Sequence, residues 1–124
     1  MQEIWHSISY KGAIPPGHAV LAEAHIDAAS PWFCGHFPEE PILPGIAILS
    51  MVTDVIRHTA FEKGKRINIT GIRRVRFRTP VRPDESLSIS LFSPDHSDDL
   101  SYHFTVEVNG DTACTGIMEE EPLL

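Results

Sequence analysis

The chain reads PILPGIAILSMVTDVIRHTAFE over residues 41–62, and its pattern changes at Gly45. Four prolines and two glycines within residues 31–45 exclude a helix or a central strand there. After Gly45, apolar residues make the first three helical turns apolar on most sides: Ile46, Ile48, Leu49, Met51, Val52, Val55 and Ile56. Such a helix belongs in a core. We predict a buried helix over residues 45–62, about 27 Å long at ~1.5 Å per residue, closed by Lys63-Gly64-Lys65.

Strand patterns flank this helix on both sides. Before it, residues 18–29 alternate loosely between apolar and polar side chains. After it, Asn109-Gly110 is a hairpin turn signal within a run of strand patterns. An antiparallel sheet wrapped around one helix buries both elements with short connections. We predict a single α+β domain over residues 1–124, with its core at about 18–119 and the acidic end Glu119-Glu120-Glu121 frayed. The strands predicted after the helix are 66–79, 85–92, 100–108 and 112–118.

Charge is distributed unevenly along the chain. The net charge is −7, which argues against general nucleic-acid binding. Residues 57–82 nevertheless hold nine basic side chains, among them Arg57, and one acid, so this segment carries +8 and the rest of the chain −15. Either the segment forms a basic face for an acidic partner, or its charge solubilises an exposed strand.

The predicted strand over residues 66–79 carries many of these cations. Alternation along a strand places Arg74, Arg76 and Arg78 on one face. The opposite face then holds Ile67, Ile69, Gly71, Arg73, Val75, Phe77 and Thr79.

Several classes of protein are not expected. No apolar run approaches the roughly 18 residues that span a membrane, and the N-terminus lacks the basic and apolar regions of a signal peptide. Cys34 and Cys114 form no secreted disulfide framework. No Cys/His spacing suggests a metal site, and no glycine-rich phosphate loop follows a strand. We expect a cytoplasmic protein with free thiols and no cofactor, binding neither membranes nor nucleic acids.

Two stretches resemble a known family. The sequence GHFPEEPILPGI over residues 35–46 is similar to the signature of the FabA/FabZ-type 3-hydroxyacyl-[acyl carrier protein] dehydratases, and IRRVRFRTPVRPD over residues 72–84 is similar to a strand of that family. The resemblance covers roughly residues 10–119. It implies a hot-dog fold, in which a sheet wraps one long helix, and an acyl thioester substrate carried by acyl carrier protein in fatty-acid or related lipid or polyketide biosynthesis. It also implies a homodimer or higher oligomer, with the histidine loop meeting the partner's helix.

The resemblance assigns roles to residues of the first stretch. Dehydration needs a base for the C2 proton, and His36 suits this role because imidazole titrates near neutral pH. The N–H of Gly45, at the start of the helix, would bind the thioester carbonyl as an oxyanion hole. Phe37 and Pro44 would border the substrate, and Arg57, Arg74, Arg76 and Arg78 would face the carrier.

The acid of the family is replaced in this chain. The family has Glu or Asp fourteen residues after the histidine, and that position is Ser50 here. Serine is a poor proton donor at neutral pH, and losing a general acid costs about 10²–10⁴ in rate. Asp54 lies one turn further, where an apolar setting would favour its protonated form; one turn is ~5.4 Å, which would require a shifted substrate. Asp54 is therefore either a replacement acid or a hydrogen-bonded core or interface carboxylate.

Three functions remain open from the sequence. The leading one is a dehydratase that uses His36 as its base. The second is a non-catalytic acyl-thioester-binding subunit that lost its chemistry through Ser50. The third is a hot-dog thioesterase, in which His36 or Asp54 would activate water.

Overall fold

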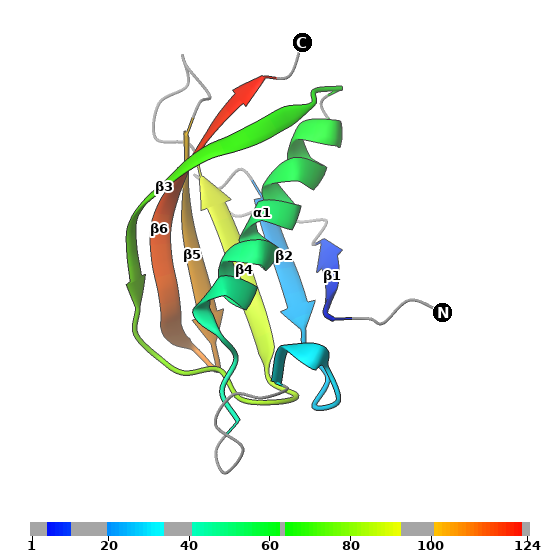
Figure 1. Ribbon diagram of the computed structural model, residues 1–124, viewed down its shortest axis with the longest axis vertical. Helices are drawn as coiled ribbons and strands as arrows, with labels where there is room; N and C mark the ends of the chain where they lie inside the picture. Colours follow the sequence, from blue (N-terminus) through cyan, green and yellow to red (C-terminus); the bar gives the residue numbers. More distant parts are fainter. Residues whose placement is uncertain (1–4, 11–19, 34–40, 63, 93–100, 123–124) are drawn as a thin grey trace.

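One antiparallel sheet curves around one helix (Figure 1). A computed structural model describes residues 5–10, 20–33, 41–62, 64–92 and 101–122. The strand order in the sheet is β1-β2-β4-β5-β6-β3, so β1 and β3 are its edges. The elements, in chain order, are β1 (Ser7–Tyr10), β2 (Val20–His25), the 3-10 helix η1 (Pro31–Phe33), α1 (Gly45–Glu62), β3 (Ile67–Phe77), β4 (Ser86–Phe92), β5 (Ser101–Val108) and β6 (Asp111–Pro122).

Helix α1 has the bounds predicted from the sequence and lies across the concave face of the sheet (Figure 1). Its core side includes the fully buried residues Met51, Val52 and Val55. At its C-terminus, Gly64 adopts the left-handed conformation with φ 73°. The N–H groups of Gly64 and Lys65 donate to the carbonyls of Phe61 and Ala60, each at 2.9 Å. These bonds form a Schellman cap and fix where the chain leaves the helix.

The central strands alternate as predicted. In β4, Leu87, Ile89 and Leu91 are fully buried, and the buried residues of β5 likewise lie at every second position. Asn109 and Gly110 both have positive φ, at 52° and 82°, as a two-residue type I′ hairpin requires. The prediction of one α+β arrangement of sheet and helix is confirmed.

Two predictions at the ends of strands are wrong, and one short strand was not predicted. β2 ends at His25, because Ala28 and Ala29 form a turn. The acidic end is not frayed, since residues 119–121 belong to β6 and pair with β3. The short strand β1, which pairs with β2, was not predicted because its alternation of polar and apolar residues is only four residues long.

A β-bulge in β3 contradicts the predicted alternation of the arginines. Arg73 pairs with Ile117 and Arg76 with Thr115, so Arg74 and Val75 together face the single residue Gly116. An extra residue in one strand advances the alternation by one position. Arg73 therefore lies on the same outer face as Arg76, where it forms an ion pair with Glu119. A second irregularity, between Ile69 and Gly71, places Arg73 on the face opposite to Ile67.

The two cysteines have different outcomes. Cys114 is a free thiol in the core, and burial raises its pKa to about 11. Cys34 lies outside the described residues. Within the described part of the chain, no helix is both long and apolar enough to cross a membrane.

Candidate functional site

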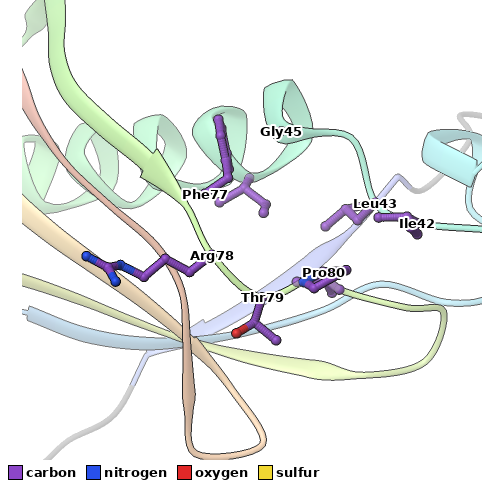
Figure 2. Close-up of a pocket in the computed structure, with 9 residues that line it drawn as sticks. Ile42, Leu43, Gly45, Phe77, Arg78, Thr79 and Pro80 are labelled. Carbon is purple, nitrogen blue, oxygen red and sulfur yellow. The ribbon is translucent and has the colours of Figure 1, made fainter.

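A hollow of about 260 Å³ lies at the start of α1. Its walls come from two distant parts of the chain: the segment that enters the helix, with Leu43 and Gly45, and the end of β3 with the residues after it, including Phe77 and Val81 (Figure 2). The N–H of Leu43 donates to the carbonyl of Val81 at 2.8 Å and ties the two segments together. The hollow thus joins the two stretches that carry the family resemblance.

Gly45 lies in close contact with an aromatic ring. A Cβ atom at this position would lie 2.6 Å from Cζ of Phe77, well inside van der Waals contact. Figure 2 shows the Phe77 ring beside the first turn of α1, with Arg78 extending away from it. The N–H of Ala47 donates to the carbonyl of Pro44 at 3.0 Å, whereas the N–H of Gly45 has no backbone partner among the described residues. The start of the helix is also the positive end of its dipole. The site therefore offers donors to a carbonyl or oxyanion, as the predicted role of Gly45 needs.

Ser50 occupies the exposed side of α1. It is half-buried and lies in a stripe along the helix with Ile46 and Arg57, which are both exposed. Neither Ser50 nor any carboxylate is among the described residues that line the hollow. Among the described residues, this chain therefore supplies no acidic side chain to its own hollow.

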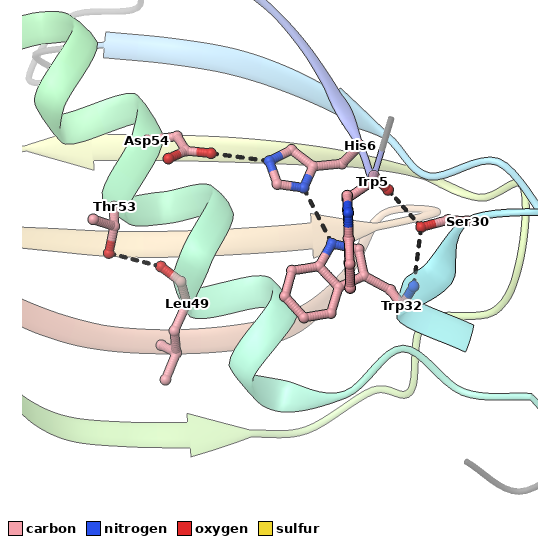
Figure 3. A network of polar contacts seen from close by, with 7 residues as sticks. All are labelled: Trp5, His6, Ser30, Trp32, Leu49, Thr53 and Asp54. Carbon is pink, nitrogen blue, oxygen red and sulfur yellow. Dashed lines mark hydrogen bonds and ion pairs between the residues drawn. The ribbon is translucent and has the colours of Figure 1, made fainter. Parts of the chain in front are cut away.

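Asp54 does not have the apolar setting predicted for it. Its side chain is 47% exposed, and its Oδ2 lies 2.9 Å from Nε2 of His6 (Figure 3). On the other side of the imidazole, Nε1 of Trp32 donates to Nδ1 of His6 at 3.2 Å. Since an indole N–H only donates, Nδ1 must accept, so Nε2 carries the proton and donates to Asp54. Of the two predicted roles, this geometry matches the hydrogen-bonded carboxylate, although at the surface and not in the core.

His6 could not be selected from the sequence as the partner of Asp54. The two residues are 48 positions apart, and no local pattern links them. The ring of Trp5 packs edge-on against the ring of Trp32, with 4.7 Å between the two centroids. The hydroxyl of Ser30 donates to the carbonyl of Trp5 at 2.6 Å. The N-terminal segment, η1 and α1 are thus fastened together by one polar network (Figure 3).

The remaining predicted site residues are dispersed. Arg78 lines the hollow at the start of α1, whereas Arg57 lines a second hollow at the other end of the helix. Arg74 lines a third hollow on the outer face of the sheet, and Arg76 is exposed. Pro44 is half-buried immediately before α1. The predicted residues His36 and Phe37 lie outside the described residues.

Comparison with known proteins identifies the family of this chain. A family model described as ApeI dehydratase matches residues 13–117. The chain belongs to the ApeI-like dehydratase family. It is also 32% identical over 104 residues to a 3-hydroxyacyl-[acyl-carrier-protein] dehydratase FabZ of Haemophilus influenzae, covering 79% of this chain and 70% of that one. The predicted membership of the FabA/FabZ-type dehydratases is confirmed.

Other FabZ relatives match over a shorter stretch. The FabZ of Syntrophobacter fumaroxidans is 42% identical over 77 residues, which is 58% of the ApeI-like chain and 52% of that protein. For the FabZ of Oleidesulfovibrio alaskensis the identity is 35% over 80 residues, again 52% of the relative. The match thus spans about half the length of these two relatives.

Solved structures establish the fold. One chain of the dehydratase heterocomplex ApeI:P from Xenorhabdus doucetiae superposes on the ApeI-like chain with a TM-score of 0.73 at 22% sequence identity. The superposition covers 97% of the ApeI-like chain and 98% of the Xenorhabdus chain. A hypothetical thioesterase with coenzyme A from Streptococcus pneumoniae gives a TM-score of 0.71 at 9% identity, covering 94% and 86%. The ApeI-like chain has the hot-dog fold.

Proposed function

We propose that this ApeI-like chain is a 3-hydroxyacyl-[acyl carrier protein] dehydratase of fatty-acid or related lipid or polyketide biosynthesis. The observation that carries the proposal is the hollow at the start of α1. The two stretches most typical of the family meet there, with Gly45 on one wall and Phe77 on the other. Its apolar walls suit an acyl chain, and the helix N-terminus suits the thioester carbonyl.

Each step of the elimination except the last has a candidate group in this chain. His36 takes the proton from C2, and the electron pair moves toward the thioester carbonyl. The N–H of Gly45 stabilises the negative charge that develops on the carbonyl oxygen. The electron pair then forms the C2–C3 double bond as the C3–O bond breaks, and the hydroxyl takes a proton from solvent and leaves as water. The last step lacks a strong acid, because Ser50 stands where the family has Glu or Asp.

Ser50 also supports a second candidate function. Asp54, the nearest carboxylate along the helix, is engaged by His6 and exposed. A chain with a formed hollow and no carboxylate among the described residues that line it is suited to bind an acyl thioester beside an active relative. The third candidate, a thioesterase, is supported only by the shared fold.

The function is tested by giving the purified protein a 3-hydroxyacyl thioester of acyl carrier protein. We expect the enoyl thioester to form, detected by mass spectrometry as the loss of one water, at a rate reduced by the missing acid. Replacing His36 with alanine should abolish the reaction. Release of free thiol instead would identify a thioesterase, and binding without either product would identify the non-catalytic subunit.

A second copy of the chain is expected on the β3 edge. β3 is 11 residues long and lies at the edge of the sheet, so one side of its backbone pairs with no strand of the described part of the chain. Beside this edge, Ile46, Ile72 and Phe77 are 67%, 44% and 53% exposed, which is typical of an interface.

We therefore expect a dimer, or a larger even-numbered assembly, in analytical ultracentrifugation at micromolar concentration. A single 13.8 kDa species would contradict this assembly. An Ile72→Asp variant should shift the protein toward the monomer, whereas Ile8→Asp, on the opposite edge strand, should not.

A further inference from the structure

A second and larger hollow lies at the C-terminal end of α1. Its volume is about 470 Å³. Three lining residues come from the last turns of the helix, and three belong to residues 65–67, at and just after the Schellman cap. They are Arg57, His58, Phe61, Lys65, Arg66 and Ile67.

The hollow has a strongly basic rim. Arg57, Lys65 and Arg66 are exposed, and none has an ion-pair partner among the described residues. The acid on the adjoining turn, Glu62, is directed to His58, with Oε1 and Nε2 3.6 Å apart. On a chain whose net charge is −7, this rim is a local positive site that steers an acidic partner to one position.

An exposed aromatic ring distinguishes this hollow from a simple cationic surface. Phe61 is 73% exposed, more than the other exposed large hydrophobic side chains. An aromatic anchor among arginines is typical of the centre of a protein–protein interface. None of the described side chains that line the hollow is a hydroxyl or an amide, the groups that commonly hydrogen-bond a nucleotide base and its ribose. The chemistry of the lining thus favours an acidic protein over a free nucleotide.

We propose that this hollow is the docking site for the acyl carrier protein, an inference that rests on the proposed function. Acidic side chains of the carrier contact Arg57, Lys65 and Arg66, and an apolar side chain covers Phe61. The sequence predicted that Arg74, Arg76 and Arg78 also face the carrier. The proposed site keeps Arg57 and does not include these three arginines. Arg74 and Arg76 lie on the outer face of the sheet, on the side away from α1.

The proposed dimer connects the docking site to the chemistry. Within one copy the two hollows lie at opposite ends of an 18-residue helix, about 27 Å apart at ~1.5 Å per residue. Antiparallel pairing of two β3 edges, centred near the middle of the strand, would bring Ile67 close to the partner's Phe77. A carrier docked on one copy then delivers its phosphopantetheine arm to the hollow of the other.

The test compares two charge reversals of equal size. Lys65→Glu/Arg66→Glu alters the proposed docking site, and the matched control Arg74→Glu/Arg76→Glu alters the strand face. Binding of a labelled bacterial holo-acyl carrier protein is measured by fluorescence anisotropy at low and high salt. We expect the first variant to raise Kd by about 10-fold or more at low salt, with the difference shrinking as salt screens the charges. At high salt the control should change Kd by less than about twofold, because exposed charges beyond a Debye length are screened. At low salt the control should weaken binding much less than the first variant does, because its charges lie farther from the docked carrier. Phe61→Ala should weaken binding at both salt concentrations.

Two further measurements separate this proposal from the proposed function. Turnover of a 3-hydroxyacyl N-acetylcysteamine thioester, which has no carrier, should be unchanged in Lys65→Glu/Arg66→Glu. If the wild-type protein turns over no thioester, the proposed dehydratase function is rejected. The anisotropy measurement of carrier binding still tests the proposed docking site in that case. An equal loss of carrier binding in the two reversals, or no loss in the first, would overturn the proposal. Loss of coenzyme A binding in the first reversal, with carrier binding retained, would instead assign the hollow to a nucleotide.

Discussion

Replacing Ser50 with glutamate is expected to raise the rate of 3-hydroxyacyl thioester dehydration by up to about 10²–10⁴-fold, the usual contribution of one positioned general acid. The new carboxyl would stand where the family carries its acid, on the half-buried side of α1. The helix should tolerate it, since an added Glu–Asp54 repulsion at i,i+4 costs only about 0.2–0.5 kcal/mol. The measurement is kcat/KM for one substrate with parent and variant.

Three control variants give this result its meaning. Ser50→Gln has nearly the same shape as Ser50→Glu but no acidic proton, so it should give no gain. His36→Ala in the Ser50→Glu background should remove the gain, because acid and base act in one elimination. Asp54→Asn should leave the parent rate unchanged, since Asp54 is engaged by His6. Parent activity that is already high and is lost in Asp54→Asn would mean that the acid moved one turn. Absence of turnover in every variant, with acyl binding retained, would establish the binding subunit.

Replacing Gly116 with alanine is expected to lower the free energy of unfolding by about 1–3 kcal/mol, the usual cost of overpacking a core. The added Cβ would lie 2.6 Å from Cζ of Phe104 and 3.2 Å from Cγ2 of Val75. Phe104 is only 1% exposed, so its ring has no space into which to move. Urea unfolding followed by circular dichroism measures the change, with the m-value as a check that the denatured state is unaltered.

Gly45 offers a matched control for this prediction. A Cβ there meets the Phe77 ring at the same 2.6 Å, but Phe77 is 53% exposed. Its ring can turn toward solvent, so Gly45→Ala should change the free energy of unfolding by less than about 1 kcal/mol. Shortening the buried ring, in Gly116→Ala/Phe104→Leu, should cost less than the sum of the two single changes. Equal stabilities of Gly116→Ala and the parent would contradict the packing described for β5 and β6.

Local signals in the sequence were sufficient to predict α1. The prolines before Gly45 and the left-handed Gly64 mark both ends of the helix, so its bounds could be read without tertiary information. The strands of the core were equally predictable, because β4 and β5 alternate without interruption. The bulge at Arg74 was not, since it arises from how β3 pairs with β6 and has no glycine to signal it.

The candidate site was only partly predictable. Family resemblance indicated Gly45, and the structure adds that Phe77 packs against it from 32 residues away. The exposure of Asp54 could not be predicted from an apolar helix, because one stripe of that helix faces away from the sheet. Its partner His6 belongs to a segment with no recognisable pattern, and only the folded chain brings the two together.

The bulge in β3 allows the strand to lose one residue without changing the hollow at the start of α1. Beyond the bulge, Phe77 pairs with Cys114 and faces the helix. Because Arg74 and Val75 together face Gly116, deletion of either one would leave a single residue there, with Arg76 still opposite Thr115 and Phe77 still opposite Cys114. Deletion of both would place Phe77 opposite Thr115, and the ring that covers Gly45 would turn outward. Natural variation in this part of β3 should therefore include the loss of one residue but not of two.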